Sequence, residues 1–411
     1  MTKTIVILGA SYTGIPIAHY LLKHTAPKAK DLKVILVAPN THLYWNVASV
    51  RGILPNMLGD DKLFFPIAPT FAKYPSDQYE LVRGVAEKVD PDRNVVEVRG
   101  NDGSARTIQY DDLQPNRVIA TGSSSKNDMP FKNLSTTEET KDALHSWAQR
   151  IASAKSIVVA GAGATGIEIA GELGQEYGVT GKKQITLISD QELPLTSKFR
   201  RDVRETAKKE LERLKVKVIT NAKVTSPTTT GPGKNSTSTI TLTKTANPNP
   251  QTSTPPPTTL QADLIIPTYG LTPNTSFLPA AMLDARGFVQ QTARLRAAGH
   301  ANVFVAGDAG NLEDPQGVYA DAQAVHLARL LAGRVEGGQK GEGEGEEEEE
   351  EYKPAGKITF AATLGRSRGT GQVGDWKVWS LLVWFLKGRY LGTNIAGEFV
   401  RGERTLSVKT W

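Results

Sequence analysis

The 411-residue sequence contains no cysteine. A disulfide framework, a thiolate metal site and a cysteine nucleophile are therefore excluded. The six histidines are scattered without the spacing of metal ligands, and no Ser-His-Asp arrangement has supporting context. We predict no metal site, and we expect neither a metalloenzyme nor a hydrolase.

Long apolar runs are also missing. No run approaches the roughly 20 residues that a helix needs to span a bilayer. The apolar stretch that follows Met-Thr-Lys is short and ends at glycine, which indicates a first strand rather than a signal peptide. Thr2 stands where N-myristoylation requires glycine. We expect a cytoplasmic protein, with peripheral attachment to a membrane left open.

The composition is otherwise that of a globular protein, with 39% hydrophobic and 22% charged residues and a net charge of +6. Nothing in it resembles a nucleic-acid motif, and no aromatic–basic interleaving is visible, so nucleic acid is not an expected partner. Two segments have the composition of solvated inserts. Residues 226–259 are mostly Thr, Pro, Ser, Asn and Gly, and residues 336–351 form an acidic Gly/Glu linker.

The rest of the chain alternates strand-like and helix-like patterns. Continuous apolar strands are predicted at Thr4–Leu8, Val34–Val37, Ile157–Ala160 and Ile185–Ile188, with helices between them. Buried strands separated by helices indicate parallel sheets covered on both faces. We therefore predict an α/β fold with two Rossmann-like dinucleotide-binding domains and a small C-terminal α+β region.

The second of the two units has the clearer phosphate-binding turn. Its strand runs directly into Gly161-Ala-Gly163-Ala-Thr-Gly166, and a helix follows. Gly161 permits the tight turn, Gly163 lets the backbone approach a pyrophosphate, and Gly166 lets helix and strand pack closely. The first unit reads Gly9-Ala-Ser11-Tyr-Thr-Gly14, with serine at the middle glycine position. Alone, this first turn is either a dinucleotide site or a plain strand-to-helix connection.

The strand ends that commonly carry an acid for the adenosine ribose carry none here. Asn40 follows the second strand of the first unit and can exchange hydrogen bonds in place of an acid. Ser189 occupies the corresponding position in the second unit, with Lys198, Arg200 and Arg201 downstream. This pattern leaves room for a 2′-phosphate, so NADH and NADPH both remain open.

Two further turns follow predicted strands. Ala120-Thr121-Gly122 follows a buried strand before the second unit, and a later strand ends in Gly307-Asp308. A carboxylate at such a strand end can accept a hydrogen bond from a ribityl hydroxyl of FAD. Each turn alone is equally consistent with an ordinary strand-to-loop connection.

The order of these four turns resembles that of the two-dinucleotide-binding-domain flavoproteins. More narrowly, the chain resembles the apoptosis-inducing-factor-like group, which includes ferroptosis suppressor proteins and type II NADH dehydrogenases. The narrower resemblance is carried by the stretch Tyr44–Arg51 and by tail positions such as Tyr352, Leu364-Gly-Arg366 and Lys387. It implies a tightly held FAD that NAD(P)H reduces and that a quinone or a similar small acceptor reoxidises. With no cysteine, electrons must pass directly to that acceptor.

The resemblance also implies a domain order. Residues 1–122 and 286–335 would bind FAD, 123–285 would bind NAD(P)H, and 352–411 would form the C-terminal region. Glu168 would lie at the junction of nicotinamide and flavin, Lys387 would belong to the catalytic site, and Arg51 would be a cofactor contact. The alternatives are a helix-dipole acid at Glu168 and a simply solvated Lys387.

The tail contains an aromatic segment, 376–390, for which we predict one helix. At helical spacing Trp376, Trp379, Val383, Leu386 and Tyr390 share a face. Such a face suits either a bilayer surface or packing on the flavin domain or across a homodimer interface. Two other functions remain open besides quinone reduction: a tailoring flavin oxidoreductase of specialised metabolism, and a redox-sensing interaction protein.

Overall fold

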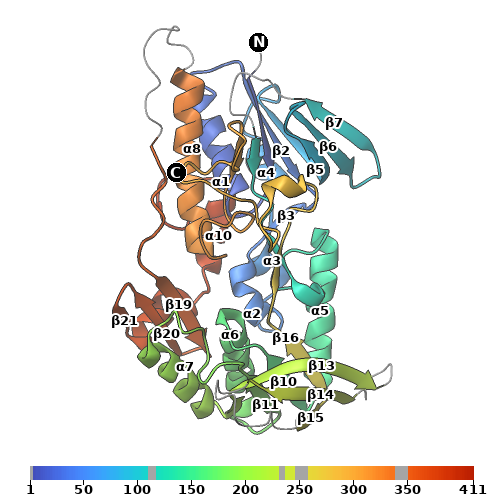
Figure 1. Cartoon of the computed structure of the whole chain (residues 1–411), viewed down its shortest axis with the longest axis vertical. Coiled ribbons are helices and arrows are strands. Elements are labelled where there is room, and N and C mark those ends of the chain that lie inside the picture. The colour runs from blue at the N-terminus through green and yellow to red at the C-terminus, as the bar shows by residue number, and fades with distance from the viewer. Residues whose placement is uncertain (1–2, 110–116, 231–236, 246–257, 338–349) are drawn as a thin grey trace.

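The computed structural model describes residues 3–109, 117–230, 237–245, 258–337 and 350–411. Its largest sheet has seven strands (Figure 1). Five of them are parallel, and β6 and β7 extend the edge as an antiparallel hairpin. The spatial order is β18 (Val303–Val305), β8 (Arg117–Ile119), β1 (Lys3–Leu8), β2 (Leu32–Ala38), β5 (Tyr79–Asp90), β6 (Val95–Gly100) and β7 (Ala105–Gln109).

The helices α1 (Gly14–Tyr20) and α8 (Gly317–Gly337) pack together over this sheet (Figure 1). α1 continues into a π-helical turn, η1 (Leu21–Thr25). The middle strands are apolar throughout, and β1 has four consecutive buried residues, because both of their faces are covered. The continuous apolar pattern of the sequence thus has its physical cause in packing on both faces. The helices α1 and α8 cover the side of Ile5 and Ile7, and the segment with Leu278, Met282 and Val289 covers the side of Val6 and Leu8.

The second sheet has four parallel strands in the order β12 (Val216–Ile219), β11 (Gln184–Ile188), β10 (Ser156–Ala160) and β16 (Leu264–Pro267). Its helices are α5 (Thr137–Ser153), α6 (Ala164–Leu173) with its π-helical continuation η4 (Gly174–Gly178), and α7 (Arg201–Arg213). The two predicted βαβ units are therefore present, and the α/β expectation is confirmed.

The chain passes between the two sheets twice, and the two connections pair with each other. Strands β9 (Ser123–Ser125) and β17 (Leu271–Pro273) form a short antiparallel ladder. The Thr121 hydroxyl donates to the carbonyl of Asn274 over 2.6 Å, and the Asn274 amide donates back to the carbonyl of Thr121 over 2.9 Å. These bonds fix the Thr121–Gly122 turn at the boundary between the sheets.

The predicted solvated insert at 226–259 is wrong in part. Three antiparallel strands occupy much of it: β13 (Ala222–Thr230), β14 (Thr237–Lys244) and β15 (Thr258–Ala262). Ile240 and Leu242 are buried with Val158 and Ile188 of the second sheet. Threonine favours strands, and two well-spaced apolar residues suffice to attach the layer. Residues 231–236 and 246–257 lie outside the described residues.

The first two residues of the predicted acidic linker, 336 and 337, belong to α8. Glu336 forms an ion pair with Lys28, and Val335 is buried. Residues 338–349 lie outside the described residues.

The predicted C-terminal α+β region is present. Strands β19 (Thr359–Leu364), β20 (Arg368–Val373) and β21 (Trp376–Val378) form an antiparallel sheet. They are followed by α9 (Ser380–Val383), the π-helical turn η6 (Trp384–Gly388) and α10 (Thr393–Val400). The single helix predicted over 376–390 is therefore wrong at its start, because residues 376–378 pair with β20 instead.

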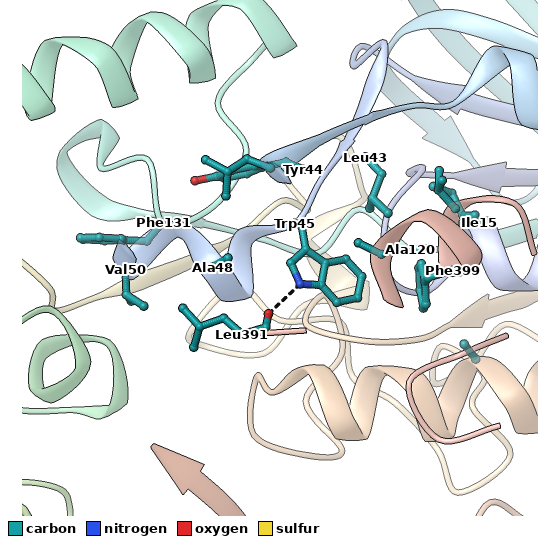
Figure 2. Packing of buried hydrophobic residues seen from close by; sticks show 14 of the residues in the cluster. Ile15, Leu43, Tyr44, Trp45, Ala48, Val50, Ala120, Phe131, Leu391 and Phe399 are labelled. Atoms are coloured by element: carbon teal, nitrogen blue, oxygen red, sulfur yellow. Dashed lines mark hydrogen bonds between the residues drawn. The ribbon is translucent and has the colours of Figure 1, made fainter. Parts of the chain in front are cut away.

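The C-terminal region is attached to the first sheet through an aromatic cluster (Figure 2). The Trp45 indole N–H donates to the carbonyl of Leu391 over 2.9 Å, and its ring contacts Tyr12 and Phe399. At the end of the chain, the Trp411 indole donates to the carbonyl of Pro16 in α1. Tyr12 belongs to the first glycine-rich turn, so the tail packs directly behind that turn.

The remaining elements are short. They comprise the hairpin β3 (His42–Tyr44) with β4 (Phe64–Pro66), the helices α2 (Ser49–Gly52), α3 (Asp60–Leu63) and α4 (Ala68–Phe71), and the 3-10 turns η2 (Asn46–Ala48), η3 (Lys126–Asp128) and η5 (Ala280–Met282). In the part of the chain that the structure describes, no helix has the length and apolar character to cross a membrane.

Candidate functional site

The first glycine-rich turn leads from β1 into α1. Gly9 has φ +110°, in the left-handed region that favours glycine. A Cβ atom on Gly14 would overlap the carbonyl oxygen of Gly9, so α1 can start this close to β1 only with glycine there. Ser11 lies between them and lines a cavity of about 940 Å³ at the carboxyl ends of the parallel strands. This edge is where α/β sheets bind their ligands.

The residues around this cavity fit FAD. Asn40, at the end of β2, lines it and is 8% exposed. Its Oδ1 atom is buried and has no hydrogen-bond partner among the described residues. A buried acceptor without a partner costs free energy unless a ligand satisfies it. A ribose hydroxyl would supply the missing donor. Thr121 lines the same cavity.

The Gly307–Asp308 turn lies beside the first turn. Gly307 has φ +77°, and a Cβ atom there would lie 2.7 Å from the hydroxyl of Thr13. The Oδ2 atom of Asp308 accepts from the Ser123 hydroxyl over 2.8 Å and from the Lys132 ammonium over 2.7 Å. The sequence did not indicate Lys132 as a site residue, because no motif surrounds it.

The second glycine-rich turn repeats the geometry of the first. Gly161 has φ +106°, and a Cβ atom on Gly166 would overlap the carbonyl oxygen of Gly161. A Cβ atom on Gly163 would meet no protein atom within 4 Å. The protein's own packing therefore does not require glycine at 163, whereas a pyrophosphate lying on the helix N-terminus does. The turn fits a nicotinamide dinucleotide.

Ser189 does not present its hydroxyl to this turn. The residue is 1% exposed, and its Oγ atom donates to the carbonyl of Leu193 and accepts from the N–H of Gln191. The downstream cations are also engaged: Lys198 pairs with Asp314, Arg200 with Asp202, and Arg201 with Glu192 and Glu205.

Glu168 and Lys387 are 219 residues apart, and the structure joins them. The Lys387 ammonium lies 2.7 Å from Oε1 of Glu168. The same oxygen accepts from the backbone N–H of Thr363 over 2.8 Å, and Lys387 also donates to the carbonyl of Ala361. The Glu168 side chain is 7% exposed and that of Lys387 is 28% exposed. Glu168 lies beyond the first turn of α6, which begins at Ala164.

Arg51 takes a position that the sequence did not predict. Its guanidinium lies 2.7 Å from Oε1 of Glu172 on α6, and it donates to the carbonyl of Gly388 over 3.1 Å. The described bonds of Arg51 are thus made to protein groups. Glu172 was missed, although its place one helical turn after Glu168 was visible in the sequence.

Burial raises the pKa of the Glu172 carboxyl, and Arg51 opposes that shift by stabilising the charged form. The side chain is fully buried, and its Oε2 atom has no partner among the described residues. The pair is held between α2, α6 and η6, which are three separate parts of the chain.

The C-terminal region has an exposed apolar face. We define this face by its seven large side chains, which are Trp376, Trp379, Leu381, Leu382, Phe385, Leu386 and Tyr390. Trp376 and Trp379 are each 81% exposed. Val383, predicted to share this face, is instead buried. It packs against Gly369 so closely that a Cβ atom there would overlap it. The prediction failed there because the helix starts at Ser380 and packs one side against β20.

Comparison with known proteins identifies the family. The model of the pyridine nucleotide-disulphide oxidoreductases matches residues 3–326. The chain belongs to that family. The chain is 37% identical to oxidoreductase ptaL of Pestalotiopsis fici over 93% of this chain and 94% of that protein. It is 24% identical to human ferroptosis suppressor protein 1 over 97% and 95% of the two chains.

Among solved structures, NDH2 from Plasmodium falciparum in complex with NADH superposes with a TM-score of 0.70 at 12% identity, over 97% of this chain and 99% of that one. The fold is therefore the FAD/NAD(P)-binding oxidoreductase fold, and the protein is an FAD-dependent pyridine nucleotide oxidoreductase. The absence of cysteine means that this member performs no disulphide chemistry of its own.

Proposed function

We propose that the protein passes hydride from NAD(P)H through FAD to a quinone or a similar small acceptor. The observation that carries this proposal is the Glu168–Lys387 ion pair, which joins the first turns of the helix after Gly166 to the C-terminal region. A nucleotide bound on the Gly161–Gly166 turn extends from the start of that helix. The pair is then placed where nicotinamide and flavin meet.

In this proposal residues 1–122 and 286–335 hold FAD, and residues 123–285 hold NAD(P)H. When bound, FAD would supply the redox chemistry, taking a hydride from the nucleotide and passing two electrons to the acceptor, with the further proton that a quinone needs coming from solvent. The protein orients the two cofactors and excludes water. Asn40 would hold the ribose, and one carboxylate oxygen of Asp308 would accept a hydrogen bond from a ribityl hydroxyl, while Ser123 and Lys132 donate to its Oδ2 atom. Lys387, held by Glu168, would present its side-chain amine to the reacting rings.

We propose that the protein acts at a lipid surface, because a lipid-soluble quinone would be reached there. The exposed tryptophans of the apolar face support this proposal. So does Arg389, an exposed cation beside Tyr390 that suits anionic lipid. Attachment would be peripheral. Leu386 on this face and Lys387 at the site are neighbours, so an acceptor leaving the lipid there would enter next to the ion pair.

The hydride cycle is tested by the absorption spectrum of the purified protein. We expect a yellow protein that bleaches under anaerobic NADH or NADPH and regains its colour when a short-chain ubiquinone is added. The relative bleaching rates rank the two nucleotides. A colourless protein that takes up no added FAD would contradict the proposal.

The lipid contact is tested by co-sedimentation with vesicles that contain an anionic phospholipid. The variant Trp379→Ser with Leu386→Ser should sediment several-fold less than the wild type, since each exposed apolar side chain contributes to interfacial binding. Val373→Ser, also exposed but outside the defined face, is the matched control. A wild-type protein that stays in the supernatant and elutes as a dimer, while the double variant elutes as a monomer, would assign the face to a homodimer.

A tailoring oxidoreductase that reduces one specific small molecule is the second candidate. The higher identity to oxidoreductase ptaL than to ferroptosis suppressor protein 1 favours it. A protein that NAD(P)H bleaches but that no quinone reoxidises would decide for this candidate.

A further inference from the structure

Three acidic side chains follow one another along α6 and η4 at four-residue intervals, and each is paired with a cation from another part of the chain. Glu168 pairs with Lys387, Glu172 with Arg51, and Glu176 with Arg366. Four-residue spacing places groups on successive turns of a helix. α6 is thus the common support for α2, the β19–β20 hairpin and η6.

The middle pair differs from its neighbours in what its cation contacts. Nη2 of Arg51 bonds both Oε1 of Glu172 (2.7 Å) and the carbonyl oxygen of Gly388 (3.1 Å), and Nε makes a second bond to the same carboxylate (3.0 Å). Gly388 directly follows Lys387. Two consecutive residues of η6 are therefore attached to two consecutive turns of α6, one by its ammonium and one by its backbone.

The packing around this attachment is close. A Cβ atom on Gly171 of α6 would lie 2.6 Å from the N–H nitrogen of Gly365, so the hairpin sits directly on the helix. Arg51 is 9% exposed and Glu172 is fully buried. Burying such an ion pair gives little net stability compared with well-packed apolar residues. The rigid guanidinium fork does, however, fix the direction of each bond it makes.

We infer that the Arg51–Glu172 pair is a positioning device that sets the place of Lys387 relative to the nicotinamide–flavin junction. The inference rests on the proposed function, and it assigns Arg51 to η6 rather than to a cofactor. Arg51 holds the carbonyl of Gly388, this bond fixes the backbone of η6, and the backbone directs the Lys387 ammonium to Glu168. Without the pair, the ties between η6 and α6 among the described residues are the Lys387 side chain and packing contacts.

The test uses the full-length protein with Arg51→Met and Glu172→Gln combined. Removing Arg51 alone would leave a buried, unpaired carboxylate that can prevent folding, whereas the combined change leaves a neutral pair of similar volume. Arg366→Met with Glu176→Gln is the matched control, since it removes the next pair along the same helix without touching η6.

The first readout is hydrogen–deuterium exchange of residues 384–391, which does not depend on activity. The amides of Arg389 and Leu391 bond to the carbonyls of Trp384 and Lys387. The Arg51/Glu172 variant should exchange these amides faster than the wild type, and the control should not. Unchanged exchange in the variant would overturn the inference, even if the protein proves inactive.

The second readout is the rate of anaerobic flavin reduction at saturating NADH or NADPH. The Arg51/Glu172 variant should retain FAD and its visible spectrum but reduce roughly tenfold more slowly, since misplacing a reacting group by about 1 Å costs up to about a hundredfold. In a Lys387→Met background the Arg51/Glu172 change should have no further effect, because it acts through Lys387. The control should stay within about twofold of the wild type.

Faster exchange with an unchanged reduction rate, or losses that multiply in the Lys387→Met background, would reduce the pair to a structural tie and overturn the positioning role. Failure of the proposed function looks different. In that case the wild-type flavin itself is not reduced by either nucleotide, and the reaction for which Lys387 would be positioned does not exist.

Discussion

The two glycine-rich turns have the same backbone and different middle residues. Gly9 and Gly161 both take φ values above +100°, and Gly14 and Gly166 both lie against the carbonyl oxygen of the turn's first glycine. Between them stand Ser11 in one turn and Gly163 in the other. The outer glycines are required by the protein's own contacts, whereas the space at Gly163 is free of protein atoms. We therefore expect the middle position to matter for ligand binding rather than for folding.

The largest effect is expected from the outer glycines. Gly166→Ala should lower the free energy of unfolding by about 3 kcal/mol or more, because the new Cβ atom overlaps backbone that cannot move independently. Gly14→Ala should do the same in the first turn. Gly163→Ala is the control. Urea unfolding measures all three, and a Gly166→Ala variant as stable as Gly163→Ala would contradict the shared geometry.

Low pH should lower the stability of the first dinucleotide-binding unit, because His19 of α1 is buried in its neutral form. Burial lowers the pKa of His19 to about 3. Nε2 faces the carbonyl of Val400 and Nδ1 faces the Tyr74 hydroxyl, which suits the neutral ring. The unfolded chain binds the proton more readily below its ordinary pKa of 6.5, so stability is fully present above pH 6.5 and is lost as the pH falls toward 3.

Between pH 6.5 and 5 the His19 contribution should lower the free energy of unfolding by about 2 kcal/mol. Urea titrations of the wild type and of His19→Asn at both pH values measure it. The variant starts less stable but should lose less on acidification. Parallel pH profiles would show that His19 is not the group responsible.

The middle positions should affect ligands more than folding. Gly163→Ser makes the second turn resemble the first, and it should weaken NAD(P)H binding by about tenfold while the free energy of unfolding stays within about 0.5 kcal/mol. Titration of the flavin-loaded protein with nucleotide gives the dissociation constant. Ser11→Gly, the reverse exchange, should leave nucleotide binding unchanged. Equal effects of the two substitutions would remove the distinction between the turns.

The smallest effects should come from the ends of the second strands. Asn40→Ala should weaken FAD binding several-fold, since a net hydrogen bond contributes about 1 kcal/mol. Ser189→Ala should leave nucleotide affinity unchanged, because its hydroxyl is used inside the turn. Fluorescence of released FAD tests Asn40→Ala, and nucleotide titration tests Ser189→Ala. Loss of nucleotide affinity in Ser189→Ala would restore the role that the sequence suggested.

The sequence predicted the architecture because local patterns encode it. Continuous apolar strands indicated covered sheets, and the order of four glycine turns resembled that of flavoproteins with two dinucleotide-binding domains. The prediction from sequence failed for segments whose secondary structure depends on the part of the protein that they pack against. The Thr-rich insert forms strands because Ile240 and Leu242 pack against an apolar surface that includes Val158 and Ile188. Trp376, predicted to begin the tail helix, instead forms part of strand β21, because its backbone pairs with the edge of β20.

By itself the sequence predicted candidate site residues in the glycine turns and at Asn40 and Asp308, and the resemblance to flavoproteins added Glu168 and Lys387. It also determined what is excluded, since a chain without cysteine cannot relay electrons through thiols. Only the tertiary structure decided which of these groups meet. The pairs Glu168–Lys387 and Glu172–Arg51 join residues 219 and 121 positions apart. No local pattern encodes such contacts, because they depend on how separately formed units pack around α6.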